Sequence, residues 1–178
     1  MSQFVITGMP RTGTAWLSVF LTYRDTVCRH DLFSAEGVSA GARRLEEDVF
    51  GAYGVADCGV VAYLDKVRAR WPVAQWVILT RPADQCRASV QRAFGFDFDA
   101  TRHAALTEFA ARQLGDNALV VPFEQVFDRA DEIAAHCDLR WVPDKARTAE
   151  LRRMNIQVRP QALFDRLRTA ILREDLWD

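Results

Sequence analysis

The chain has 178 residues and a mass of 20.2 kDa, which suits a single globular domain spanning residues 1–178. Its 49% hydrophobic and 26% charged residues fall in the ordinary range for such domains, and no apolar run approaches the roughly 20 residues of a membrane span. The net charge of −1 excludes a strongly basic nucleic-acid-binding protein. We therefore expect neither nucleic acid nor a membrane as partner.

The cysteines and the N-terminus indicate the compartment. Four cysteines are widely spaced, with no CxxC pair and no Cys/His set at zinc-ligand spacing, so we expect free thiols and no metal site. The first residues lack a basic segment followed by an apolar one, so no signal peptide is visible. These features favour a reducing cytoplasm. Arginine accounts for 21 of the 23 basic residues, and guanidinium groups suit oxyanion ligands.

Strands and helices alternate along the chain. The predicted strands are short and apolar: Gln3–Thr7, Thr26–Arg29, Gly54–Cys58, Gln75–Thr80 and Ala118–Pro122. The predicted helices are Thr14–Tyr23, Ala42–Tyr53, Val60–Trp71, Pro82–Phe94, Asp99–Leu114 and Phe123–His136. The segment His30–Ala40 is polar and is expected to be a loop. Residues 139–178 are expected to form two Arg-rich helices, Pro143–Met154 and Pro160–Leu176, packed on the domain.

This alternation predicts an α/β fold with three layers, α/β/α, around a roughly five-stranded parallel sheet of the P-loop-NTPase-like type. Such sheets bind ligands at the carboxyl ends of their strands. The chemistry is therefore expected at Gly8–Ala15, His30–Asp31, Asp57 and Arg81.

The first turn has the pattern Gly-x-x-x-x-Gly from Gly8 to Gly13. Such a loop turns backbone N–H groups inward, and the helix that follows adds partial positive charge, so together they bind phosphate or sulfate. The pattern departs from Walker A because Thr14 replaces the lysine and Ala15 replaces the hydroxyl that holds Mg²⁺. Arg11 supplies the positive charge instead.

A second segment follows the strongest predicted strand. Arg81 stands at the carboxyl end of that strand, and Ser89 lies two turns into the next helix. Both side chains can point at one phosphate, which the guanidinium grips as a fork and the hydroxyl binds through one hydrogen bond.

The two segments together resemble the sulfotransferase family. Pro-Arg-Thr-Gly-Thr-Ala, starting at Pro10, is similar to the family's 5′-phosphosulfate loop, and Arg81 with Ser89 is similar to its 3′-phosphate signature. A weaker similarity, Val120–Val126, extends the resemblance over about Phe4 to His136. The resemblance implies 3′-phosphoadenosine 5′-phosphosulfate (PAPS) as cofactor and 3′,5′-ADP (PAP) as product. It places the cofactor on Pro10, Arg11, Thr12, Gly13, Thr14, Ala15, Trp16, Arg81 and Ser89.

The resemblance also implies catalytic roles. Arg11 would stabilise charge on the leaving phosphate, with no metal required. His30 is the favoured general base, followed by Asp31 and then Asp57, because imidazole titrates near neutral pH. The other histidines, His103 and His136, are expected in helices away from this edge. Trp16 either stacks on adenine or faces the core.

Some features depart from the family. Ala15 lacks a hydroxyl, and a C-terminal Arg-Lys-Gly segment is missing, for which Arg152-Arg153 is a weak substitute. A catalytically silent phosphonucleotide-binding or interaction module on the same fold is therefore the alternative. A P-loop nucleotide kinase is disfavoured by Thr14 and Ala15. The acceptor is expected to be a small molecule or glycan bearing a hydroxyl or amine.

Overall fold

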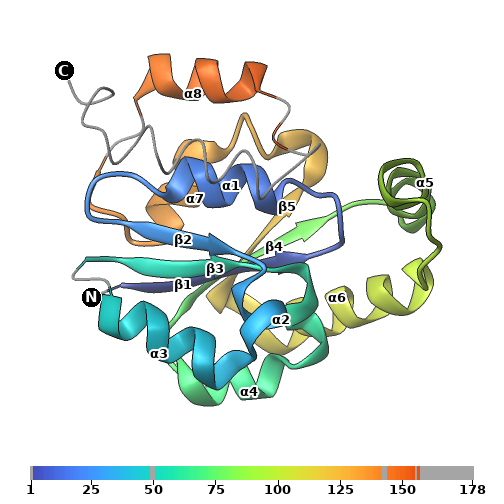
Figure 1. Cartoon of the computed structure of the whole chain (residues 1–178), viewed down its shortest axis with the longest axis horizontal. Coiled ribbons are helices and arrows are strands. Elements are labelled where there is room, and N and C mark those ends of the chain that lie inside the picture. Colours follow the sequence, from blue (N-terminus) through green and yellow to red (C-terminus); the bar gives the residue numbers. More distant parts are fainter. Residues whose placement is uncertain (1, 49–50, 142–143, 155, 157–178) are drawn as a thin grey trace.

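A computed structural model describes residues 2–48, 51–141, 144–154 and 156 (Figure 1). Its centre is a five-stranded sheet in the order β2-β3-β1-β4-β5, and every pair of neighbouring strands is parallel. The strands are β1 (Gln3–Gly8), β2 (Val27–His30), β3 (Tyr53–Ala56), β4 (Gln75–Thr80) and β5 (Ala118–Pro122). The predicted parallel α/β sheet and the positions of its five strands are confirmed.

Helices cover both faces of the sheet, which confirms the three layers (Figure 1). One face carries α1 (Thr14–Leu21), α7 (Ala130–His136) and α8 (Lys145–Arg153). The other carries α2 (Leu32–Glu36), α3 (Val38–Asp48), α4 (Leu64–Arg70) and α6 (Ala100–Leu114). Helix α5 (Ala83–Phe94) lies beyond the end of β4, at the side of the molecule. Short 3-10 turns are η1 (Cys58–Ala62), η2 (Gly115–Asn117) and η3 (Phe123–Gln125).

The hydrophobic core consists of two clusters, one on each face of the sheet. Along β1, Phe4 and Ile6 belong to the cluster under α1, whereas Val5 belongs to the cluster under α3 and α4. All three side chains are fully buried because successive strand residues point to opposite faces and both faces are covered. The apolar strands of the sequence thus form the middle layer, against which the helices on both faces pack.

Several element boundaries differ from the predictions. The helix predicted over Val60–Trp71 is divided into η1 and α4. The expected loop His30–Ala40 contains α2 and the start of α3, because Leu32 and Phe33 bury against the second core cluster. The helix predicted over Ala42–Tyr53 ends earlier, since Tyr53 begins β3. The helix predicted over Phe123–His136 is divided into η3 and α7. The predicted helix Pro160–Leu176 lies outside the described residues.

Helix α8 closes the face that carries α1. Arg147 donates from its guanidinium to the carbonyl oxygens of Val19, Phe20 and Thr22 at 2.8–3.1 Å, which satisfies the C-terminal end of α1. Burial lowers the pKa of Arg147, because the charged guanidinium loses contact with water at the helix end. No helix in the described part of the chain is long and apolar enough to cross a membrane.

Candidate functional site

The loop between β1 and α1 forms the centre of the candidate site. Gly8, Arg11 and Gly13 all have positive φ values, of 131°, 63° and 94°, which fold the loop sharply back over the end of β1. The hydroxyl of Thr12 donates to the carbonyl oxygen of Met9 at 2.5 Å and closes the turn from inside. Helix α1 begins at Thr14, so the N–H groups of its first turn face the loop without intrahelical acceptors. This arrangement suits an anion.

Two arginines from distant parts of the sequence meet at this loop. Arg81 leaves the end of β4 and donates through Nη1 to the carbonyl oxygen of Arg11 at 2.9 Å. Arg11 in turn donates through Nε to the hydroxyl of Ser89 on α5 at 3.3 Å. Burial, and then the neighbouring charge of Arg81, lower the pKa of Arg11. Two guanidinium groups held this close form a concentrated positive site for a polyanion.

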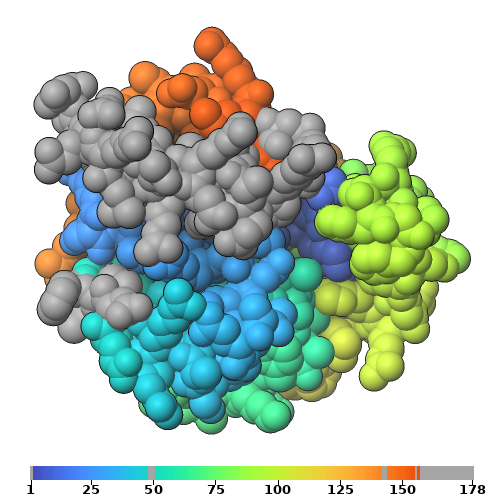
Figure 2. Space-filling view, viewed as in Figure 1, coloured from blue at the N-terminus to red at the C-terminus, as the bar shows by residue number. Residues whose placement is uncertain are grey.

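Aromatic rings flank both arginines. The guanidinium of Arg81 lies over the ring of Phe123 at 4.3 Å, and that of Arg11 lies 5.4 Å from the ring centre of Phe94. Phe94 is 53% exposed and stacks on the exposed Phe96. In Figure 2 the yellow-green segment around α5 stands as a lobe beside the blue start of the chain. Cation–π contacts thereby support both arginines.

A cavity of about 130 Å³ lies under the loop. Its lining comes from the loop, the ends of β2 and β3, and the end of α5: Pro10, Arg11, Gly13, Thr14, Ala15, His30, Asp31, Cys58 and Phe94. The cavity brings the predicted anion loop and the two favoured base candidates to one place. Arg81 and Ser89 reach this group through Arg11.

His30 and Asp31 are directly paired. The Nδ1 atom of His30 lies 3.2 Å from an Asp31 carboxylate oxygen, and its Nε2 atom lies 3.2 Å from the hydroxyl of Thr14. Burial lowers the pKa of His30 to about 4, against a smaller opposing effect of Asp57. Burial, and then the charge of Asp57, raise the pKa of Asp31 to about 7. The expectation that His30 titrates near neutral pH is therefore wrong, because the imidazole is enclosed.

Asp57 is occupied by its own turn. Its carboxylate accepts hydrogen bonds from the backbone N–H and hydroxyl of Ser34, both at 2.6 Å, and from the N–H of Gly59 at 2.8 Å. Ligand atoms of Asp31, Asp57 and Cys58 lie within 4.8 Å of one another. Burial first, then these two carboxylates, raise the pKa of Cys58 to about 12, which leaves the thiol protonated. Asp57 is thus best explained as a structural carboxylate that anchors α2.

The opposite pKa shifts of His30 and Asp31 predict opposite pH dependences of stability. A raised carboxyl pKa means that Asp31 adds stability as the pH falls from about 7 towards its ordinary value of 3.8. A lowered imidazole pKa means that His30 removes stability as the pH falls from 6.5 to about 4. When the pH is lowered from 8 to 5, the free energy of unfolding of His30→Gln should therefore rise relative to that of wild type. The free energy of unfolding of Asp31→Asn should fall relative to wild type over the same change.

Urea unfolding of the wild-type chain and both variants at pH 8 and pH 5 measures these differences in the free energy of unfolding. The effect of Asp31→Asn is expected to be the smaller, since the Asp31 side chain is 48% exposed and that of His30 only 14%. Variants whose stability changes with pH as in wild type would contradict the assignment of these shifts.

Packing engages the side chains of Trp16, a predicted cofactor contact, and Arg152, the weak substitute for the C-terminal segment. Trp16 is only 2% exposed, stacks on Phe20 and donates through Nε1 to the carbonyl oxygen of Leu151 at 3.0 Å. Of the two roles open for Trp16, the structure assigns the core and excludes stacking on adenine. Arg152 contacts the carbonyl of Phe127 and pairs with Asp128, so it does not replace the missing C-terminal segment at the loop.

His103 was placed away from the site by the sequence, and this placement is wrong. It extends from the first turn of α6, and its Nε2 atom donates to the carbonyl oxygen of Gly8 at 3.0 Å. The residue therefore supports the entrance of the loop from the opposite layer. Its position in the helix gave no signal of this contact, because the sequence does not fix the path of the connection 95–99 between α5 and α6. His136 lies at the other end of the sheet, against the carbonyl of Trp76.

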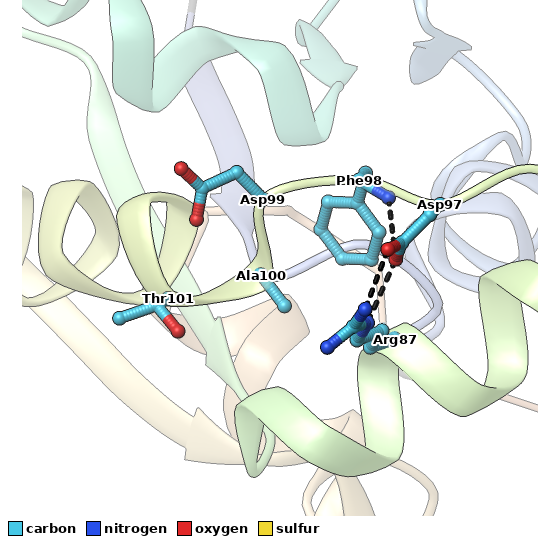
Figure 3. Close-up of a pocket in the computed structure, with 6 residues that line it drawn as sticks. All are labelled: Arg87, Asp97, Phe98, Asp99, Ala100 and Thr101. Carbon is cyan, nitrogen blue, oxygen red and sulfur yellow. Dashed lines mark hydrogen bonds and ion pairs between the residues drawn. The ribbon is translucent and has the colours of Figure 1, made fainter.

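A larger hollow of about 390 Å³ lies beside the start of α6 (Figure 3). Figure 3 shows the guanidinium of Arg87 facing the carboxylate of Asp97. The guanidinium donates two hydrogen bonds to this carboxylate, at 2.6 and 2.8 Å. Both side chains are more than half exposed, and their charges neutralise one another. Of these two, the smaller cavity under the loop is the better candidate site, since it joins the loop to titratable groups that the fold encloses.

The strand order and the glycine loop between β1 and α1 define a P-loop-NTPase-like fold. No family model and no curated protein matches the chain. Solved structures do match. A mouse sulfotransferase, SULT7A1, in complex with PAP is similar at TM-score 0.59 and 10% identity, over 84% of this chain and 63% of that chain. A tunicamycin resistance protein from Deinococcus radiodurans is similar at TM-score 0.52 and 12% identity, over 81% of this chain and 100% of that chain.

A gluconokinase from Sinorhizobium meliloti is similar at TM-score 0.45 and 14% identity, over 77% of this chain and 91% of that chain. At these identities the similarities establish the fold alone. The chain spans about 63% of the length of the mouse sulfotransferase.

Proposed function

We propose that the chain binds PAPS and transfers its sulfuryl group to a hydroxyl or amine of a small-molecule or glycan acceptor, releasing PAP. The observation that carries this proposal is the contact between Arg81 and the carbonyl oxygen of Arg11. It joins the two segments that resemble the sulfotransferase family, although 70 positions separate them in the sequence. The fold similarity to a PAP-bound mouse sulfotransferase supports the same reading.

The residues present fit a nucleotide with anionic groups at two ends. The loop and the start of α1 offer backbone N–H groups and Arg11 to a 5′-phosphosulfate. Arg81 and Ser89 stand beside them and offer a guanidinium and a hydroxyl to a 3′-phosphate. A nucleotide without the 3′-phosphate would leave the second cationic position unused.

The chain's own groups suit the chemistry of transfer. PAPS supplies an activated sulfuryl group whose departure leaves negative charge on the 5′-phosphate. Arg11 lines the cavity and is placed to stabilise that charge. His30 is unprotonated at neutral pH, since its pKa is about 4, and Nε2 is the atom that accepts the acceptor's proton. Above pH 7, where Asp31 is ionised, its carboxylate at Nδ1 then stabilises the imidazolium.

One observation favours the catalytically silent module as a second candidate. The cavity of about 130 Å³ is small beside the roughly 300–1,000 Å³ typical of ligand sites, and Ala15 offers no hydroxyl to it. Such a protein would bind the phosphonucleotide without consuming it. The nucleotide kinase is disfavoured further, because Thr14 at the lysine position contacts His30 rather than supplying a cation.

Titration calorimetry with PAP and with 5′-AMP tests the proposal. PAP should bind about tenfold or more tightly than 5′-AMP, because only PAP engages the second cationic position. Equal affinities, or no binding, would contradict it. Release of PAP from PAPS in the presence of hydroxyl and amine acceptors separates the enzyme from the silent module, which binds PAPS and leaves it intact. Consumption of ATP with Mg²⁺ would instead support the kinase.

A further inference from the structure

Thr14, His30 and Asp31 form a hydrogen-bonded row across the cavity. The Thr14 hydroxyl, at the first position of α1, lies 3.2 Å from Nε2 of His30, the last residue of β2. On the other side of the ring, Nδ1 lies 3.2 Å from Asp31. All three residues line the same cavity as Arg11. The row therefore connects the anion loop to the base candidates directly.

The direction of these hydrogen bonds follows from the chemistry of the groups. Above pH 7 the Asp31 carboxylate only accepts, so Nδ1 of His30 carries the proton and donates. Nε2 of the neutral ring then has a lone pair, and the Thr14 hydroxyl donates to it. The atom that must accept a proton in the proposed reaction is thus already engaged in the free protein.

The Thr14 hydroxyl has one proton and two competing acceptors. It stands at the start of α1, where the loop gathers anionic oxygens, and a charged oxygen is a stronger acceptor than a neutral imidazole. Building on the proposed function, we propose that Thr14 is a positioning residue that couples the loop to the base. Its hydroxyl engages Nε2 of His30 when the loop is free and turns to the donor's phosphate or sulfate when the loop is filled.

The coupling through Thr14 sets the order in which donor binding and acceptor activation occur. His30 becomes able to accept a proton only after the donor has bound, so acceptors are activated second. Among the described residues, Asp57 and Cys58 also lie near His30, and neither is hydrogen-bonded to its Nε2 atom. Asp57 acts on the ring from the end of β3 through its charge, while its oxygens are held by Ser34 and Gly59. Cys58 lines the cavity as a protonated thiol.

Nitrogen NMR of the histidine side chains in the full chain at pH 8 tests this coupling. The His30 signals are assigned with His30→Gln. Saturating PAP should shift the Nε2 signal of wild-type His30 towards the value found in free Thr14→Val, which lacks the hydroxyl. Free Thr14→Ser, which keeps the hydroxyl, should match free wild type. His136, whose Nε2 contacts Trp76 far from the cavity, is the internal control and should not move.

The outcomes separate this inference from the proposed function. If calorimetry finds PAP bound and the His30 signal does not move, the coupling is overturned and the proposed function stands. If Thr14→Val and Thr14→Ser give the same His30 signal in the free protein, the contact itself is refuted. If PAP does not bind, both proposals fail together. Thr14→Ala replaces Thr14→Val should the latter not fold.

Discussion

Replacing Arg81 with alanine is expected to weaken PAP binding by about thirtyfold or more, while binding of 5′-AMP changes by less than about threefold. The difference arises because a charge-assisted, forked hydrogen bond to the 3′-phosphate is lost, and 5′-AMP has no group at that position. Calorimetry of the variant with both nucleotides measures the effect. An equal loss for both would mean that Arg81 supports the loop and does not recognise the phosphate.

Arg87→Ala is the matched control for this prediction. Arg87 lies on the helix that carries Ser89, but its guanidinium faces Asp97 on the surface (Figure 3). Removing it deletes the same charge from the same region and leaves the contact between Arg81 and Arg11 in place. The control variant should bind both nucleotides as wild type does. An equal loss of PAP affinity in Arg87→Ala and Arg81→Ala would mean that the loss follows from the change in net charge and not from a specific contact of Arg81 with the 3′-phosphate.

The sequence predicted the convergence of the two arginines because parallel topology leaves little freedom. Once β1 and β4 are recognised as buried parallel strands, the residues that follow them must lie at the same edge of the sheet. Arg11 and Arg81 therefore meet although they are 70 positions apart in the sequence. The same argument placed His30 and Asp31 beside the loop, since β2 ends at the same edge.

The burial and the hydrogen-bond partners of individual side chains could not be predicted from the sequence. The pKa of His30 depends on enclosure by Thr14, Asp31 and the loop, and no local pattern encodes that enclosure. Trp16 was undecided because a helix buried on all sides has no polar face to reveal its orientation; all eight residues of α1 are buried. His103 was misplaced because its contact with Gly8 spans 95 positions and depends on where α6 packs.

Gly8→Ala is expected to destabilise the fold by about 4 kcal/mol or more, a large fraction of the stability of a domain this size. Gly8 has a φ of 131°, and a Cβ atom built there would lie 2.0 Å from the carbonyl oxygen of Leu79 in the neighbouring strand β4. That oxygen cannot move aside, because it accepts the N–H of Met9 at 3.0 Å within the sheet. The overlap must push β1 and β4 apart at the entrance of the loop.

Gly37→Ala is the control, since Gly37 also has a positive φ, of 82°, but described atoms leave open space around its Cβ position. That variant carries only the backbone strain of its φ of 82° and ψ of 157°, about 1–3 kcal/mol. Thermal unfolding should therefore lower the Tm by about 10 °C or more in Gly8→Ala and by less in Gly37→Ala. Equal Tm values would mean that the close approach of Gly8 to Leu79 is not what holds the loop against the sheet. The separation of β1 and β4 would also move Arg11 away from Arg81, so PAP binding should fall with the Tm in the first variant alone.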